Sequence, residues 1–154
     1  MTKPLRLGIA GLGTVGVGVI KIIQNKLSLL EARTGKQILI SAVTAKSKTK
    51  DRGIDLSSYQ WERDPVSIAE REDIDVFIEL IGGHEGAAKE AVEIAISKGK
   101  NVVTANKALL AHHGHELALK AEENGSILRF EAAVAGGIPV IKSLTEGLAG
   151  NSIN

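Results

Sequence analysis

Short apolar runs alternate along this chain with longer segments in which apolar residues recur every three or four positions. Runs of strand type cover Leu5–Ala10, Gln37–Ala45, Asp75–Ile81, Asn101–Thr104 and Ile127–Ala132. Helical spacing covers 14–32, 65–70, 86–98 and 108–123, and a last helix is expected from 136–139 to about residue 149. Strands that alternate with helices in this way indicate βαβ units. The pattern therefore predicts an α/β fold with a doubly wound, mainly parallel sheet and helices on both faces.

The same pattern assigns inward faces and ends to the predicted helices. Gly35 is expected to end the first helix, and Asp64, which precedes Pro65, is expected to cap the second. Apolar spacing predicts two inward faces, which are Val15, Val19, Ile22, Ile23 and Leu30 in the first helix and Ala88, Ala91, Val92, Ala95 and Ile96 in the helix over 86–98. We expect residues 1–150 to form one domain. Residues 151–154 read as the start of another strand, so we expect the chain to be a fragment in which a second domain begins.

Composition narrows the class of protein. With 154 residues, 44% of them hydrophobic and 24% charged, the chain is typical of one globular domain. The absence of cysteine excludes disulfides and thiolate chemistry. A net charge of +1 and 3% aromatic residues argue against nucleic acid as a partner. No apolar run is long enough to span a membrane, and the first strand leaves no room for a signal peptide, so we expect a cytoplasmic protein.

A glycine motif joins the first strand to the first helix. Gly11, Gly13 and Gly16 follow the pattern G-x-G-x-x-G directly after Leu5–Ala10. This strand, turn and helix order is what a dinucleotide-binding fingerprint requires, and it predicts a Rossmann-type NAD(P)-binding domain. Gly11 would make the tight turn, Gly13 would admit a pyrophosphate, and Gly16 would let the helix pack closely on the strand. The predicted cofactor loop is Gly11, Leu12, Gly13, Thr14, Val15 and Gly16. The alternative is a glycine turn that only joins two elements.

The end of the second predicted strand bears on the choice of cofactor. An acidic residue there would bind the ribose hydroxyl of NAD. This chain has no acid at that position, and four bases follow within seven residues, namely Lys46, Lys48, Lys50 and Arg52. Such bases attract a 2′-phosphate, which favours NADP over NAD or at least tolerance of it, with Lys46 as the predicted contact. The alternative is a solvated loop without a phosphate role.

Three further segments carry a resemblance to a known family. They are Ile78–Gly83, Val102–Lys107 and Phe130–Pro139. Together with the glycine turn they resemble the nucleotide-binding domain of homoserine dehydrogenase over essentially the whole chain. The resemblance implies an NADP- or NAD-dependent oxidoreductase that interconverts L-homoserine and L-aspartate 4-semialdehyde in threonine and methionine biosynthesis. It also implies a small-molecule substrate, a following catalytic domain that this chain lacks, and a homo-oligomeric parent protein.

The resemblance also implies roles for individual residues. Lys107 matches a lysine associated with cofactor and substrate, so it is the candidate catalytic residue. Ile81, Gly82 and Gly137 are assigned to the cofactor. A monovalent cation, sodium, would be held by the Glu131 side chain and by the carbonyl groups of Val134, Gly136 and Ile138.

The residues by themselves leave other interpretations open. Without the resemblance, the residues favour Lys107 as an ordinary lysine at a helix start and Glu131 as a side chain that caps or orients its loop. His112, His113 and His115 lack a matching third ligand, so an exposed polar helix face is predicted rather than a metal site. Glu79 lies in an apolar strand, and it could bond to a loop or to the nucleotide. At the level of function, the alternative is a non-enzymatic NAD(P)-binding or redox-sensing module.

Overall fold

The computed structural model describes residues 3–152 and has one six-stranded sheet at its centre. The strands are β1 (Leu5–Ala10), β2 (Ile38–Thr44), β3 (Gln60–Trp61), β4 (Val76–Glu79), β5 (Asn101–Thr104) and β6 (Leu128–Arg129). Their order across the sheet is β3-β2-β1-β4-β5-β6, and each neighbouring pair is parallel. This is the strand order of a doubly wound sheet. The chain adds β2 and β3 on one side of β1 and then crosses over to add β4, β5 and β6 on the other side. The predicted fold class is confirmed.

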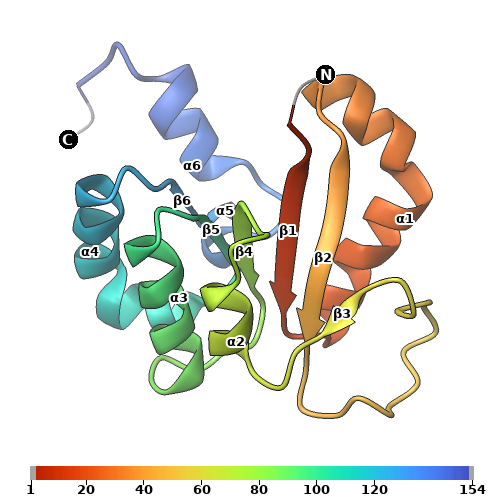
Figure 1. Ribbon diagram of the computed structural model, residues 1–154. Helices are drawn as coiled ribbons and strands as arrows, with labels where there is room; N and C mark the ends of the chain where they lie inside the picture. The colour runs from red at the N-terminus through yellow and green to blue at the C-terminus, as the bar shows by residue number, and fades with distance from the viewer. Residues whose placement is uncertain (1–2, 153–154) are drawn as a thin grey trace.

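Helices cover both faces of the sheet (Figure 1). They are α1 (Thr14–Thr34), α2 (Pro65–Glu70), α3 (Ala87–Ser97), α4 (Lys107–Glu123), α5 (Glu131–Val134) and α6 (Val140–Lys142), and a π-helical turn, η1 (Ser143–Gly147), continues α6. Residues of α1 pack with Ile9, Val43 and Ile78 in one apolar cluster. Residues of α2, α3 and α4 pack with Phe77 and Val102 in the other. Among residues 3–152, no helix combines the length and apolar character needed to cross a membrane.

The buried faces and the ends of the helices test the predictions made from apolar spacing. The predicted inward face of α3 is confirmed, since all five residues are buried, and so are the ends at Gly35 and Asp64. The face predicted for α1 is wrong at Val15 and Ile22, which are 54% and 58% exposed. Gly16 and Ile20 are buried in their place. The first half of α1 is apolar nearly all round, so spacing alone does not determine which side meets the sheet.

Several predicted boundaries are also corrected. The strand predicted over 75–81 covers only Val76–Glu79, and the strand predicted over 127–132 covers only Leu128–Arg129 because the chain turns into α5 at Glu131. The strand β3 was not predicted, since its two residues carry no alternation. The last helix ends at Gly147 rather than near residue 149. Of the strand expected over 151–154, residues 153 and 154 lie outside the described residues, and Asn151 and Ser152 form no strand.

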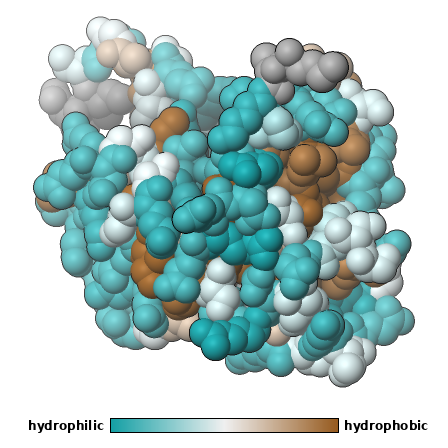
Figure 2. All heavy atoms as spheres, in the orientation of Figure 1, coloured by the Kyte–Doolittle hydropathy of each residue, from teal (hydrophilic) through white to brown (hydrophobic). Residues whose placement is uncertain are grey.

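The surface in the same view is mostly hydrophilic, with a brown patch where Figure 1 draws the upper part of α1 and β2 (Figure 2). These two elements expose Val15, Ile22, Leu29 and Leu39. Leu39 stands between Ile38 and Ile40, which pack with α1, so its exposed side chain lies on the opposite face of the sheet from α1.

Candidate functional site

A cavity of about 480 Å³ opens at the carboxyl edge of the sheet, where the chains leaving β1 and β4 diverge. In doubly wound folds this reversal point is where ligands bind. Gly11, Leu12 and Gly13 after β1 form one wall, and Leu80 and Ile81 after β4 form another. The rest of the lining comes from Thr44, Ala45, Lys46, Ser47, Lys50, Arg52, Arg63, Asp64, Pro65 and Ala87.

The glycine turn is shaped by close backbone approach. Gly11 has φ +101°, and a Cβ there would lie 2.4 Å from the carbonyl oxygen of Leu80. A Cβ on Gly16 would lie 1.9 Å from the carbonyl oxygen of Gly11, so α1 is pressed against the turn rather than against the strand body. A Cβ on Gly13 would meet nothing within 4 Å. The first and third glycines therefore build the turn, and the second leaves space beside the cavity.

The start of α1 is suited to an anion. Gly13 is the N-cap residue, and among residues 3–152 no side chain caps the N–H groups of the first turn. Such N–H groups, together with the helix dipole, form a site for phosphate. A pyrophosphate fits here on two observations, which are the uncapped turn and the open space at Gly13.

Glu79 fixes the loop after β4, which forms the second wall of the cavity. Its side chain is fully buried, and Oε1 accepts hydrogen bonds from the N–H groups of Ile81 (2.7 Å) and Gly82 (3.1 Å). Oε2 accepts from the Thr104 hydroxyl on β5 at 2.5 Å. Of the two roles left open for Glu79, the structure assigns it to the loop. The N–H groups of Ile81 and Gly82 are thereby used within the protein.

Thr104 and Asn106 extend this network to the start of α4. The Thr104 hydroxyl oxygen accepts from the Asn106 N–H (3.0 Å), and the Asn106 side chain caps α4 through the Leu109 N–H (3.1 Å). The Asn106 amide also donates to the Gly83 carbonyl at 2.6 Å. Lys107, the first residue of α4, stays exposed. In this segment Thr104 and Asn106 fix the backbone, and Lys107 is left available at the sheet edge.

The bases after β2 divide into two groups. The Arg52 guanidinium donates hydrogen bonds to the carbonyl oxygens of Leu12 (3.2 Å), Lys50 (2.8 Å) and Ser47 (2.5 Å). It also lies 5.6 Å from the centre of the Trp61 ring. It thus ties the loop to the glycine turn. Lys46 and Lys50 line the cavity and form no ion pair with any residue in 3–152, whereas Lys48 lies outside the lining.

One carboxylate shares the cavity with these bases. Asp64 caps α2 by accepting from the Ser67 N–H at 2.7 Å, and this hydrogen bond lowers the pKa of the Asp64 carboxyl. Arg63 lies 3.0 Å from the same carboxylate. Asp64 is therefore ionised and locally neutralised, so the positive charge of Lys46 and Lys50 is not cancelled by it.

The segment predicted to hold sodium is arranged around a helix start. Glu131 accepts from the N–H groups of Ile141 and Lys142, both at 3.0 Å, which caps α6. The Ile138 carbonyl accepts from the Val140 N–H at 2.8 Å. Val134, Gly136 and Ile138 are exposed. Each of these oxygens keeps a second lone pair, so the donor set is compatible with a hard cation, and capping is the role that the contacts show.

Two of the three histidines of α4, His112 and His113, contact other side chains. His113 is only 16% exposed in its side chain and lies 2.8 Å from Glu85, so its prediction as an exposed residue is wrong. His112 stacks on His84 with ring centres 4.2 Å apart. Within residues 3–152 no group of three His, Asp or Glu side chains is placed to hold a metal ion.

The predicted cofactor residues are thus only partly brought together. The cavity lining contains Gly11, Leu12, Gly13, Lys46 and Ile81, and it does not contain Thr14, Val15, Gly16, Gly82, Lys107 or Gly137. Lys50, named in the sequence as one of the bases that attract a 2′-phosphate, also lines the cavity. Sequence reasoning missed Arg63 and Asp64 as wall residues, and it missed the bracing by Arg52, Thr104 and Asn106. Asn106 had a visible signal, as an asparagine directly before a helix, and Asp64 had one as the predicted cap of α2.

A doubly wound sheet with this glycine turn and this cavity defines a dinucleotide-binding domain of the Rossmann class. The sequence profile described as "Homoserine dehydrogenase, NAD binding domain" matches residues 11–131. The chain therefore belongs to the homoserine dehydrogenase family, as its NAD-binding domain.

Individual proteins agree with this assignment. The homoserine dehydrogenase of Neisseria gonorrhoeae is 48% identical over 151 residues, which cover 98% of this chain and 34% of that protein. The crystal structure of a homoserine dehydrogenase from Thiobacillus denitrificans superimposes with a TM-score of 0.88 at 40% identity, covering 97% of this chain and 34% of the other. A hyperthermophilic archaeal homoserine dehydrogenase mutant in complex with NADPH superimposes with a TM-score of 0.78 at 26% identity, covering 96% and 50%. The chain thus spans about a third of the length of the relative from Neisseria.

Proposed function

We propose that this domain holds NADP(H) for a longer homoserine dehydrogenase that interconverts L-homoserine and L-aspartate 4-semialdehyde. The observation that carries the choice of cofactor is the pair Lys46 and Lys50, free bases that line the cavity where an acid would select NAD. The similarity to an archaeal relative in complex with NADPH supports it. Bound nicotinamide supplies the hydride chemistry, and the protein supplies position and electrostatics.

Each wall of the cavity then has a task. The uncapped N–H groups at the start of α1 bind the pyrophosphate beside Gly13. Lys46 and Lys50 attract the 2′-phosphate of the ribose. Ile81 and the loop fixed by Glu79 support the path toward the nicotinamide, and Gly82 and Gly137, both with positive φ, permit close backbone approach on that side.

Lys107 is the proposed catalytic residue of this chain. It lies at the first position of α4, just after β5, and Asn106 fixes the backbone on which it stands. An ammonium there would stabilise negative charge on phosphate or on the substrate oxygen. The remaining substrate contacts are assigned to the part of the longer protein that this chain does not cover.

We also propose that Glu131, with the carbonyls of Val134, Gly136 and Ile138, binds sodium. The support is the free lone pairs on these oxygens. Sodium titration of the chain in potassium-free buffer should move the amide resonances of 134–138, and Glu131→Gln should remove that response. An unchanged spectrum up to high sodium concentration would leave Glu131 as a cap of α6 alone.

Cofactor choice is tested by reversing one charge. Lys46→Asp places a repelling carboxylate beside the 2′-phosphate, so the affinity for NADP(H) should fall about tenfold more than the affinity for NAD(H). Calorimetry with both cofactors measures the two affinities. Lys48→Asp is the matched control, since Lys48 lies outside the cavity lining, and it should change the ratio little. Equal losses for both cofactors in Lys46→Asp would make Lys46 an ordinary surface base.

Activity is tested on the 154-residue chain and on a longer form from the same gene. The chain alone should not oxidise homoserine, and the longer protein should do so. In that longer protein Lys107→Ala should lower kcat/KM on the order of 10²-fold, the usual cost of one electrostatic contact to the transition state. Lys107→Arg should restore it only in part. Wild-type kcat/KM in Lys107→Ala would reduce Lys107 to a helix-start residue, and a longer protein that binds NADP(H) without turnover would support a non-enzymatic module.

A further inference from the structure

A second cavity, of about 570 Å³, lies at the amino edge of the sheet, opposite the glycine turn. It is formed where β1, β4 and β5 begin and where α2 and α3 end. Its lining is dominated by charged side chains, namely Lys3, Arg6, Glu70, Glu72, Asp75, Lys98 and Lys100. None of these residues takes part in the cofactor cavity described above.

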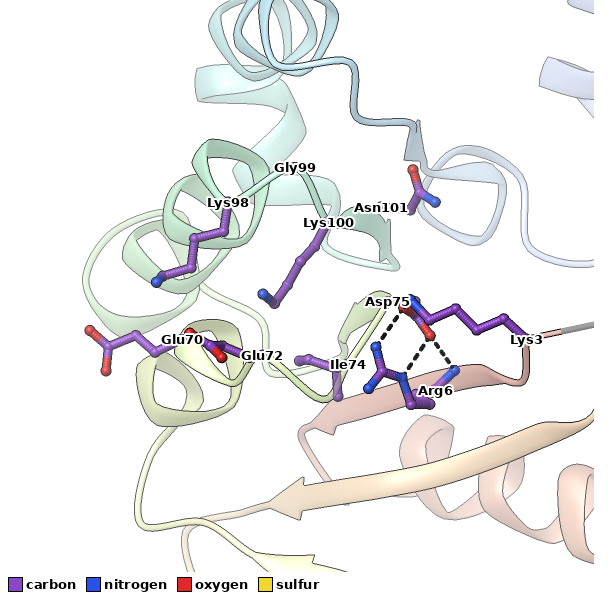
Figure 3. Close-up of a pocket in the computed structure, with 10 residues that line it drawn as sticks. All are labelled: Lys3, Arg6, Glu70, Glu72, Ile74, Asp75, Lys98, Gly99, Lys100 and Asn101. Atoms are coloured by element: carbon purple, nitrogen blue, oxygen red, sulfur yellow. Dashed lines mark hydrogen bonds and ion pairs between the residues drawn. The ribbon is translucent and has the colours of Figure 1, made fainter.

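Lys100 is the unusual residue in this cavity. It is only 7% exposed, and its side chain forms no hydrogen bond or ion pair with any residue in 3–152. Figure 3 shows the side chain extending into the cavity, with its Nζ atom in the space between Glu72 and Arg6. Lysine is almost never buried to this degree unless it is paired. Since no buried side-chain nitrogen or oxygen among the described residues lacks a hydrogen-bond partner, the buried part of Lys100 is its stem, and Nζ opens to the cavity, where no protein acceptor reaches it.

The position of Lys100 is imposed by the fold. Gly99, with φ +70°, ends α3, and the Lys100 N–H donates to the Ala95 carbonyl at 2.9 Å. This closing turn places the lysine stem over the end of α3. Burial lowers the pKa of the Lys100 ammonium, and Lys98 and Arg6 act in the same direction, while Glu72 and Asp73 oppose them. A negative ligand would relieve both the desolvation and the repulsion between the cations.

A second cationic donor faces the same space. Arg6 uses Nε and Nη2 on the Asp75 carboxylate (3.1 and 2.9 Å), which leaves Nη1 without a partner among the described residues. Lys3 also lies on Asp75, at 3.2 Å, so one carboxylate is shared by two cations. This end of the cavity is therefore positive. Glu70 and Glu72 lie at the α2 end, beside Lys98 (Figure 3).

We infer that this cavity is a binding site for a small oxyanion, a phosphate or a carboxylate, held between Lys100 Nζ and Arg6 Nη1. Phosphate and carboxylate share the chemistry that both donors require, which is a compact group of oxygens with negative charge. The volume is in the range of sites for small metabolites. Because the site lies at the opposite edge of the sheet from the glycine turn, its occupation does not depend on the proposed cofactor function.

The test is a ¹H–¹⁵N NMR titration of the 154-residue chain with inorganic phosphate in one arm and succinate in the other. We expect the amide resonances of Gly99, Lys100 and Asn101 to move in at least one arm, which identifies the preferred oxyanion. Phosphate bound at the glycine turn would instead move Gly11 and Gly13, so the two sites are separated in one spectrum. No movement at 99–101 in either arm would overturn the proposal.

Lysine substitutions test whether the Lys100 ammonium is responsible for oxyanion binding. Lys100→Met should weaken the oxyanion affinity about tenfold or more, because charge-assisted hydrogen bonds are the strong kind. Lys21→Met, on the exposed side of α1, is the matched control and should leave it unchanged. Unchanged affinity in Lys100→Met would show binding by general positive charge and would overturn the site.

Thermal denaturation without ligand tests whether the Lys100 ammonium is unpaired in the free protein. In phosphate-free buffer Lys100→Met should raise the melting temperature by about 2–4 °C, the shift that relief of roughly 1 kcal/mol produces in a domain of this size. A lower melting temperature would mean that the ammonium already has a stabilising partner, and this too would overturn the proposal.

Discussion

The two cavities at opposite edges of the sheet are built in different ways. At the carboxyl edge two walls are shaped by backbone geometry, the glycine turn and the loop after β4, and the charged residues after β2 and before α2 complete the lining. At the amino edge the lining is made of charged side chains from five separate elements or their ends. A backbone site depends on glycines and on buried acceptors such as Glu79, whereas a side-chain site depends on charge balance. The two edges should therefore respond to different substitutions.

The largest expected effect separates two glycines of the same turn. Gly16→Val places a side chain into the Gly11 carbonyl, with even the Cβ only 1.9 Å from its oxygen, so the free energy of unfolding should fall by about 3 kcal/mol or more. A Cβ at Gly13 meets no atom within 4 Å, so Gly13→Val should leave stability within about 0.5 kcal/mol of the original. Urea denaturation of both variants makes the comparison.

Cofactor binding gives a second test of the role assigned to Gly13. Gly13→Val fills the space where a pyrophosphate would lie, so calorimetry should show an affinity for NADP(H) lowered about 100-fold or more, although the protein remains folded. A Gly13→Val protein with its original affinity would contradict the placement of the pyrophosphate. Equal stability losses in both valine variants would contradict the division of roles between the glycines.

A smaller effect is expected from the buried acceptor of the same edge. Glu79→Gln keeps the size of the side chain but replaces the oxygen that accepts from Thr104 by an amide donor. Hydrogen bonds to a charged group are worth about 1.5–3 kcal/mol each, so stability should fall by about 2 kcal/mol. Amide hydrogen exchange at Ile81 and Gly82 should become faster. The exposed Glu123→Gln is the control, and unchanged exchange at Ile81 and Gly82 in Glu79→Gln would show that the loop does not depend on the carboxylate.

The comparison explains what the sequence could predict. The carboxyl edge was predictable because its glycines are close together in the chain and act through backbone geometry that is the same in every Rossmann domain. Thr104 was missed because its hydroxyl partner, Glu79, is 25 residues away, and nothing local marks the pair. The inward face of α3 was predictable from its spacing, while that of α1 was not, because apolar residues lie on nearly all sides of its first half.

The amino edge escaped prediction altogether. Lys100 reads in the sequence as one more surface lysine, directly after the glycine that ends a helix. Its burial follows from the sheet order, which places β4 between β1 and β5 and so brings Arg6, Asp75 and Lys100 around one space. The sequence shows which residues are charged but not which strands become neighbours in the sheet. Such a cluster can therefore be recognised only in the folded structure.

The smallest effect concerns the one carboxylate that anchors this amino edge. Hydrogen bonds from Arg6, together with one from Lys3, hold the pKa of Asp75 well below its usual range. Because the folded pKa is lowered, the stabilisation is present above the unfolded value of about 3.9 and is lost as the pH falls toward the folded value. Asp75→Asn should therefore cost about 1 kcal/mol at pH 7, discounted for a side chain that is partly exposed, and progressively less below about pH 4. Urea denaturation at pH 7 and at pH 3 measures both differences, with the exposed Glu122→Gln as the control. A loss of stability that stays the same at both pH values would mean that Asp75 acts through its shape and not through its charge, and the amino edge would then resemble the backbone-built edge.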